Sequence, residues 1–308
     1  MSYELVISWL QATLRWSAPL LVVASGEVLS ERSGIINMGI EGIMLCGALC
    51  GVAISFFTGN VWTAMIITML MGALLGFGVA YLTVSRRTNQ VVTGLMINML
   101  ATGGTNLIFS LLSATRSTRV NIFPQLFPAF LQQIPVVGPI FFAQPITTYI
   151  ALVLPFIVAF VLYKTNWGLN VRAVGDNPQA ASTAGLSVIK IKYQTVILSG
   201  MFAAMGGCFL TLAETGFFAS GGMTNGRGFI VLAAVVVGGW DPIRTAIACI
   251  IFGAADALQL RMQVIGSTVP YQFLQMLPYI ITVVALTIMV KKSRVPKTWG
   301  APYNPKEF

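Results

Sequence analysis

Between two long apolar segments lies the polar stretch TNWGLNVRAVGDNPQAASTAGLSVIKIK, at residues 165–192. Asp176 or Asn177 can accept a hydrogen bond as a helix N-cap, and Pro178 suits the first helical position because its missing N–H has no partner to lose there. Gly185 suits the left-handed position that follows a helix end. The stretch therefore predicts a helix of about two turns on a membrane surface.

Small side chains cover much of this predicted helix, at Ala180, Ala181 and Ala184. They would let the backbone of another protein come close. Positive charge on both sides of the helix marks this face of the membrane as cytoplasmic: Arg172, Lys190 and Lys192. We interpret the helix as the docking site for a soluble, energy-supplying partner. The spacing alone leaves open an ordinary cytoplasmic loop with one turn of helix.

The composition is that of a membrane protein. Of the 308 residues, 56% are hydrophobic and 9% are charged, which is far too apolar for a soluble domain. Because a span needs about 20 residues, we predict one all-α transmembrane domain over residues 1–308, with about nine helices (about eight to ten), some broken or re-entrant. The net charge of +9 reflects topology, not nucleic-acid binding, since no basic run alternates with aromatic residues.

Several kinds of chemistry are excluded. The chain has no histidine and no P-loop, H-E-x-x-H, C-x-x-C or G-x-S-x-G motif, so we expect no catalytic residue, no metal site and no cofactor. Its 4 cysteines all lie in apolar segments and are expected to be small buried hydrophobes. The amino-terminal residues lack the basic region and cleavage site of a signal peptide, so we expect them to begin the first span.

Apolar segments and turn residues divide the chain into spans. We predict spans at residues 5–28, 36–57, 61–84, 90–112, 146–164, 191–214, 243–259 and 271–290. Residues 230–238 are too few to cross a membrane and predict a short or broken helix, of the kind found beside substrate paths. The proline- and phenylalanine-rich loop at about residues 113–145 predicts short interfacial pieces on the external side of the membrane, away from the cytoplasm.

Lysine and arginine support this arrangement. Of the 18 in the chain, those that fall outside the proposed cytoplasmic side are Arg15, Arg116, Arg119, Arg227 and Arg261. The positive-inside rule expects such a bias. It predicts an external amino terminus and a cytoplasmic carboxyl terminus.

Polar residues inside the apolar segments need enclosure. Residues 26–42 are too polar for a lipid-facing helix, so protein or a water-filled cavity must surround them. Asn98, Thr102 and Asn106 lie four residues apart and share one helix face. They are either contacts between helices or part of a translocation path, and the spacing favours neither.

Separate segments of the chain resemble one transporter family. They are GEVLSERSGIINMGIEGIMLCGA (26–48), GDNPQAASTAGLSVIKIKYQTVILSGMFAAMGG (175–207) and GRGFIVLAAVVVGGWDPIRTAIACIIFGAADAL (226–258). In sequence and in order along the chain, these segments resemble those of the permease family of ATP-binding-cassette (ABC) importers for simple sugars, branched-chain amino acids and nucleosides. The likeness extends over residues 18–290, and the first segment is most similar to the shorter permease of nucleoside uptake systems.

The resemblance implies an assembly in the bacterial inner membrane. It contains a second homologous permease subunit as a heterodimer partner, a cytoplasmic ABC ATPase that binds ATP and Mg, and an external substrate-binding protein. The predicted docking helix matches the family's segment for coupling to the ATPase, at Gly175, Asp176, Asn177, Pro178, Ala180, Ala181, Ala184 and Gly185. The family's membrane motif falls on Glu31, Arg32, Gly34, Asn37, Gly39, Glu41 and Gly42.

A nucleoside needs hydrogen-bond partners for its ribose and base and an apolar lining for its ring. We predict that Asn37, Glu41, Asn98 and Thr102 contribute to its path. Two alternatives stay open: a permease for a simple sugar such as ribose, and an ion-coupled carrier that uses Glu41, Glu214 or Asp256. For a membrane enzyme, the sequence offers no catalytic constellation.

Overall fold

A computed structural model describes residues 3–113, 120–132, 134–220, 222–264, 273, 276, 279–284, 287, 295–301 and 303. Within these ranges the chain is all-α, as predicted, with one isolated bridge between Gln125 and Pro145. The elements are α1 (Tyr3–Arg32), α2 (Ile40–Thr58), α3 (Val61–Ala80), η1 (Tyr81–Ser85), α4 (Gln90–Ser113), α5 (Ala129–Gln132), η2 (Gly138–Phe142), α6 (Ile146–Lys164), α7 (Asn166–Asp176), α8 (Pro178–Thr183), α9 (Val188–Phe209), η3 (Leu210–Thr215), α10 (Arg227–Val237) and α11 (Pro242–Val264).

Among the described residues, 7 helical stretches are long and apolar enough to cross a membrane. They are Glu4–Arg32, Ile40–Thr58, Val61–Ser85, Gln90–Leu112, Ile146–Lys164, Val188–Thr215 and Pro242–Gln263. Helix α10 has 11 residues and is too short to span, as predicted. The predicted span at 271–290 lies mostly outside the described residues, so the total of about nine stays a prediction.

The first span ends later than predicted, inside the polar interval at residues 26–42. Helix α1 continues through it to Arg32, and only residues 33–39 form a loop. Glu27 and Glu31 are 0% and 1% exposed, so protein encloses them as predicted. The helix can continue because its polar side chains find partners inside the protein.

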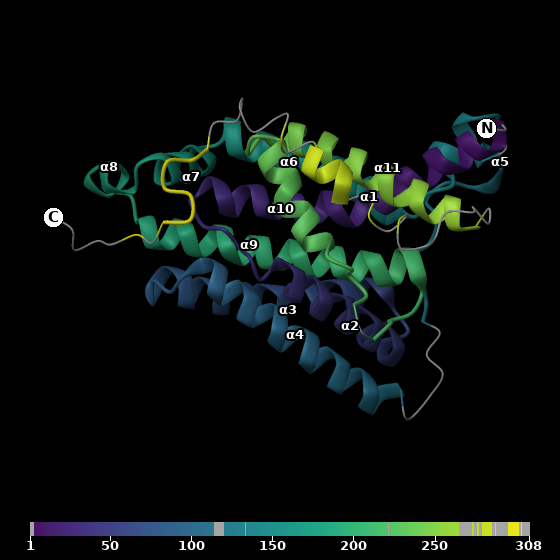
Figure 1. The fold of residues 1–308 in the computed structure, drawn as a ribbon, viewed down its shortest axis with the longest axis horizontal. Coiled ribbons are helices and arrows are strands. Elements are labelled where there is room, and N and C mark those ends of the chain that lie inside the picture. The colour runs from purple at the N-terminus through teal and green to yellow at the C-terminus, as the bar shows by residue number, and fades with distance from the viewer. Residues whose placement is uncertain are drawn as a thin grey trace.

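Helix α9 packs at the centre of the molecule against α1, α2 and α3 (Figure 1). Glycines allow the close approach. A Cβ atom at Gly200 would lie 2.5 Å from the Gly72 carbonyl oxygen of α3, and one at Gly207 would overlap the Met44 carbonyl of α2. Helix α9 therefore packs closely against α2 and α3 through these glycines.

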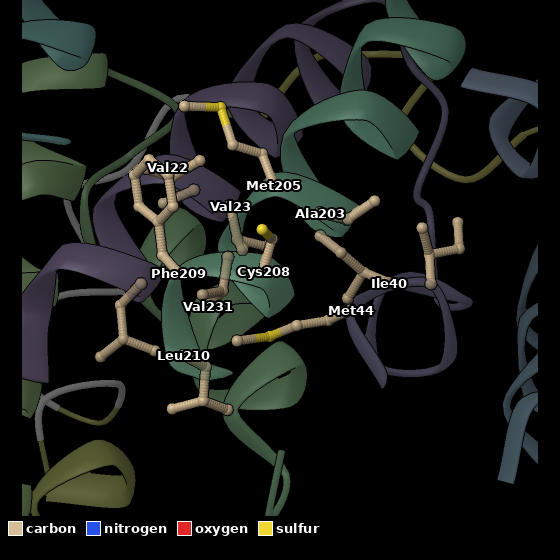
Figure 2. Packing of buried hydrophobic residues seen from close by; sticks show 14 of the residues in the cluster. Val22, Val23, Ile40, Met44, Ala203, Met205, Cys208, Phe209, Leu210 and Val231 are labelled. Atoms are coloured by element: carbon tan, nitrogen blue, oxygen red, sulfur yellow. The ribbon is translucent and has the colours of Figure 1, made fainter. Parts of the chain in front are cut away.

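The side chains of four helices meet in this core. Figure 2 shows Val23 from α1, Met44 from α2, Cys208 and Phe209 from α9, and Val231 from α10, all 0% exposed. This packing fixes the short helix α10 between the long ones. Cys208 is one of two cysteines buried as predicted, the other being Cys249, whereas Cys46 and Cys50 are half-buried.

The two ends of the molecule are built differently. Helices α7 and α8 and the segment at residues 295–301 lie at one end of the long axis, and the start of α1 and α5 lie at the other (Figure 1). The loop at 113–145 forms the short pieces α5 and η2, as predicted. Phe123 in that loop is 3% exposed, with ring centroids 5.4 Å from Trp62 and 5.9 Å from Phe209, so it packs inward.

Candidate functional site

Helix α8 is the predicted docking helix, and its start forms as predicted. Asn177 is the N-cap, and its Oδ1 accepts a hydrogen bond from the Ala180 N–H at 3.0 Å. Pro178 occupies the first helical position. Of the two predicted caps, Asp176 instead ends α7. The cap satisfies a backbone donor that a six-residue helix cannot pair internally.

The end of α8 also forms as predicted. Gly185 has φ +85° and its N–H donates to the Ser182 carbonyl at 3.0 Å. The Leu186 N–H donates to the Ala181 carbonyl at 3.0 Å. These two bonds make a Schellman motif, which requires the left-handed backbone that glycine adopts at little cost.

One side of α8 is exposed and consists mostly of small side chains. The exposed positions are Gln179, Ala180, Ser182, Thr183 and Ala184, followed by Gly185. Pro178 and Ala181 are buried and hold the helix against the rest of the protein. A partner could therefore contact the alanine side of α8 without displacing large side chains.

Lys192 does not belong to the exposed charge beside α8, which corrects the sequence interpretation. It lies in α9, is 1% exposed, and its Nζ is 5.9 Å from the centroid of the Tyr303 ring. Lys190 is exposed and Arg172 is half-buried. The polar stretch at residues 165–192 also contains more helix than predicted. Helix α7, capped by Thr165, and the first turn of α9 occupy most of it.

The unit of α7 and α8 is tied to the end of α1 and to the carboxyl-terminal segment. Gly175 is buried, and a Cβ atom there would overlap the Arg32 carbonyl oxygen. The Gly175 carbonyl accepts hydrogen bonds from the Thr298 Oγ1 at 2.6 Å and from its N–H at 3.2 Å. The Gly300 N–H donates to the Gly34 carbonyl at 3.1 Å. Residues 298–300 therefore connect both segments.

Next to this contact, Glu31, Trp240 and Trp299 form what we call the tryptophan node. The Glu31 Oε2 accepts hydrogen bonds from the indole N–H of Trp240 at 2.6 Å and of Trp299 at 2.8 Å. The two rings meet edge to face, with centroids 5.6 Å apart. The Arg32 Nε donates to the Trp240 carbonyl at 2.8 Å. The node joins α1, the turn before α11 and the carboxyl-terminal segment.

Asn37, a predicted path residue, is fully buried in a hydrogen-bonded polar group. Its N–H donates to Glu27 Oε1 at 2.9 Å, and its Nδ2 donates to the Ser199 hydroxyl at 3.1 Å. That hydroxyl donates to Glu27 Oε2 at 2.7 Å. Asn37 thus fixes the loop between α1 and α2 to α9, and its contact with substrate stays a prediction.

Glu41 holds the start of α10. Its carboxylate accepts hydrogen bonds from the Thr224 hydroxyl at 2.5 Å, the Gly226 N–H at 2.9 Å and the Gly228 N–H at 2.6 Å. A negative charge at a helix start also opposes the positive end of the helix dipole. Glu41 therefore acts as a cap supplied from another helix, α2, and shapes the glycine-rich loop before α10.

Asn98 and Thr102, the other predicted path residues, are placed differently. From α4, Asn98 accepts a hydrogen bond from the Gly42 N–H at 2.8 Å and donates to the Met38 carbonyl at 2.9 Å. Thr102 is exposed and donates to the Asn98 carbonyl at 2.9 Å. Asn98 thus joins Asn37 and Glu41 around the start of α2, whereas the Thr102 side chain bonds to the Asn98 carbonyl of its own helix.

A cavity that the sequence did not predict lies between α1, α10, α11 and the loop after η3. Its volume is about 620 Å³, which falls within the usual range of about 300–1,000 Å³ for ligand sites. The polar and aromatic side chains of its wall include Trp16, Asn225, Arg227, Asp256, Gln259, Gln263 and Tyr279. It lies at the start of α10, whereas Trp240 of the tryptophan node follows the end of α10.

Arg227 and Asp256 form an ion pair in the wall of this cavity. The Arg227 Nε is 3.4 Å from the Asp256 Oδ2, and its guanidinium carbon is 4.7 Å from the centroid of the Trp16 ring. The Tyr279 hydroxyl donates to the Asn225 carbonyl at 2.8 Å. We call Trp16, Arg227, Asp256, Gln259 and Gln263 the cavity wall. It combines an ion pair, an indole and two amides.

The signal for the cavity wall was present in α11. Asp256, Gln259 and Gln263 are polar residues three and four positions apart in a largely apolar helix, which places them on one face. Asp256 was named from the sequence as a candidate for ion coupling, but the glutamines that follow it were not named.

The acidic groups on which an ion-coupled carrier would depend all have partners. The Glu214 Oε2 is 2.8 Å from the Arg15 Nε, Asp256 pairs with Arg227, and Glu41 accepts the bonds described above. Within the part of the chain that the structure describes, no three Asp, Glu or Cys side chains gather to hold a metal ion.

Known proteins similar to this chain are transporter permeases. The family described as "Branched-chain amino acid transport system / permease component" matches residues 10–289. The guanosine ABC transporter permease protein NupQ of Bacillus subtilis is 39% identical over 307 residues, or 95% of each chain. The nucleoside ABC transporter permease protein NupC of Lactococcus lactis is 35% identical over 94% of each chain. The putative glucose ABC transporter permease protein TsgC13 of Haloferax volcanii is 36% identical over 82% of this chain and 77% of the relative.

Proposed function

Because the chain belongs to the family of permease components of branched-chain amino acid transport systems, we propose that it carries nucleosides across the inner membrane as a permease subunit of an ABC importer. The observation that carries the substrate class is the likeness to permeases named for guanosine and for nucleosides, over 94% or more of each chain. The helices long enough to span a membrane agree with a multi-pass protein.

The partners in this proposal are a second permease subunit, a cytoplasmic ABC ATPase and an external substrate-binding protein. The exposed small side chains of α8 support contact with the ATPase, at Ala180, Ala184 and Gly185. The bonds between Thr298 and Gly175 place the carboxyl-terminal segment beside α7. If α8 faces the ATPase, this segment is cytoplasmic as well.

The contacts give a route by which movement of α8 would reach the membrane core. Gly175, at the end of α7, touches the end of α1 and holds Thr298. The neighbouring Trp299 binds Glu31 together with Trp240, and α10 runs from that turn back to Arg227 at the cavity. With 11 residues, α10 spans about 16 Å and would move as a rigid rod between the two places.

A permease for a simple sugar is the second candidate. The likeness to a putative glucose permease, at 36% identity, favours it specifically. A sugar and a nucleoside share ribose-like hydroxyl groups, but only the nucleoside presents a planar base. Transport of labelled substrates therefore separates the two candidates.

The experiment compares uptake of radiolabelled guanosine, uridine and ribose by cells with the intact transporter and by cells lacking only this chain. We expect nucleoside uptake to be lost and ribose uptake to be unchanged. Loss of ribose uptake alone would favour the sugar permease. Uptake driven by an ion gradient in proteoliposomes without the ATPase would favour the carrier.

Labelling of single cysteines tests the topology on which coupling depends. With the native cysteines replaced, Asp176→Cys should react with a membrane-impermeant maleimide only from the cytoplasmic side. Asn60→Cys is the matched control, since it is also exposed but lies in the turn after α2, predicted to be external. Reaction of Asp176→Cys from outside would overturn the assignment of α8.

A further inference from the structure

We propose that the cavity between α1, α10 and α11 is a binding site for an uncharged nucleoside, in which Gln259 and Gln263 hydrogen-bond the edge of the base. This assignment rests on the proposed function and names the residues that would select the substrate. It differs from the path predicted from sequence, because Asn37, Glu41, Asn98 and Thr102 are absent from the residues that line the cavity.

The first argument is the face of α11 that borders the cavity. Asp256, Gln259 and Gln263 all line it, and Leu260 lies between them on the same face. A glutamine amide offers a donor and an acceptor side by side, so it can form paired hydrogen bonds with the edge of a base. Two amides one turn apart on a rigid helix can hold one planar ligand.

The second argument is an unused hydrogen-bond donor. The Gln263 Nε2 atom is buried and has no hydrogen-bond partner among the described residues. A buried amide N–H without a partner is costly, so a ligand acceptor that the amide reached by turning toward the cavity would be favourable.

The third argument is charge. Arg227 and Asp256 are the only charged side chains among the described residues that line the cavity, and they pair with each other at 3.4 Å. The wall therefore carries no uncompensated charge. A nucleotide phosphate would enter without a free cation to receive it, which is unfavourable away from water. An uncharged nucleoside meets no such penalty.

The fourth argument is the surroundings of the ion pair. Arg227 lies over the ring of Trp16, and Phe217 and Tyr279 also line the cavity. Aromatic walls with a few polar groups suit a heterocyclic base better than a sugar alone. Glu41 supports the site from outside, because it binds the backbone N–H groups of Gly226 and Gly228 on either side of Arg227.

The test uses the complete transporter, with both permeases, the ATPase and the binding protein, in proteoliposomes. The KM for radiolabelled guanosine is measured for the wild type, Gln259→Leu and Gln263→Leu. Each variant removes both hydrogen-bonding groups, and we expect the KM to rise about three- to tenfold. Ile251→Leu, on the exposed side of the same helix, is the matched control and should leave the KM unchanged.

The charge argument has its own test in the same vesicles. Guanosine monophosphate should not compete with guanosine uptake by the wild type. In Asp256→Asn, Arg227 loses its counter-charge, and we expect the nucleotide to become a competitor. Competition equal in wild type and variant would overturn the charge argument.

The outcomes separate the two proposals. If the wild type takes up ribose but neither guanosine nor uridine, the proposed function fails. If the wild type takes up nucleosides and both glutamine variants keep the wild-type KM, only the assignment of this cavity fails. If the complex with Gln263→Leu does not assemble, the KM values of Gln263→Asn and Gln259→Leu test the assignment. The first variant keeps the polarity of the side chain, and the second keeps its approximate volume.

Discussion

The tryptophan node and the cavity wall use the same kinds of residue to opposite effect. Each combines tryptophan with a carboxylate, and an arginine contacts the tryptophan in both: Arg32 at the node and Arg227 at the wall. In the node, Trp240 is 1% exposed and its indole N–H is bound to Glu31 at 2.6 Å. At the wall, Trp16 is half-buried and borders a cavity of about 620 Å³.

The difference separates a structural joint from a place for a ligand. A filled, hydrogen-bonded cluster fixes the relative positions of the segments that supply it. A cavity lined by aromatic and polar groups leaves hydrogen-bonding capacity for a guest. Because α10 begins at the wall and ends next to the node, the two regions are connected by one short helix.

The largest expected effect breaks the node. Trp240→Ala removes a fully buried ring and a hydrogen bond to Glu31, and truncations of this kind cost about 3–5 kcal/mol. We expect a clear fall in the thermal unfolding temperature of the purified complex in detergent. Trp16→Ala is the matched substitution at the wall and should cost less, since part of that ring already faces a cavity. Equal losses would remove the distinction between the two regions.

The next largest effect is expected at Glu41, which holds the loop beside the cavity wall. Glu41→Ala leaves the N–H groups of Gly226 and Gly228 and the Thr224 hydroxyl without their acceptor. A loss of about 2–3 kcal/mol is expected from bonds to a charged acceptor at a helix start. The rate of protease cleavage within residues 215–229 reports this loss, and cleavage should become faster. Glu41→Gln keeps one acceptor oxygen and should cleave at an intermediate rate, whereas unchanged cleavage in both would refute the capping role.

Coupling on the node side is tested at a glycine. Gly185 has φ +85° and a Cβ atom there would meet nothing within 4 Å, so Gly185→Val strains only the backbone, by about 1–2 kcal/mol. We expect ATP hydrolysis to continue with less guanosine transported per ATP. Gly59→Val is the matched control, because Gly59 has φ +67° and equal space but lies in the turn between α2 and α3. A similar loss in both variants would argue against a special role for α8.

Local signals in the sequence predicted α8 well. An N-cap side chain, a proline and a left-handed glycine act within a few residues, so Asn177, Pro178 and Gly185 could be assigned without a fold. The span at residues 146–164 coincides with α6 for the same reason, since its limits are set by apolar length. The role of such a helix still depends on a partner that its own residues do not reveal.

Contacts between distant segments could not be predicted in this way. Glu31 binds Trp299 across 268 positions of the chain, and Glu41 binds Gly226 across 185. Both acids stood out as polar residues in apolar surroundings, which predicts enclosure but not the enclosing partner. The cavity arises from α1, α10 and α11 together, so only the polar spacing in α11 could have indicated it.

The smallest expected effect concerns Thr102, which belongs to neither region. Its side chain is exposed and bonds only to the carbonyl four residues earlier in its own helix among the contacts described. Thr102→Ala should therefore change stability by less than about 0.5 kcal/mol. It should also leave the KM for guanosine at the wild-type value if the cavity wall holds the substrate. A raised KM in Thr102→Ala, with Gln263→Leu unchanged, would move the substrate path from the cavity wall to α4 and restore the prediction made from sequence.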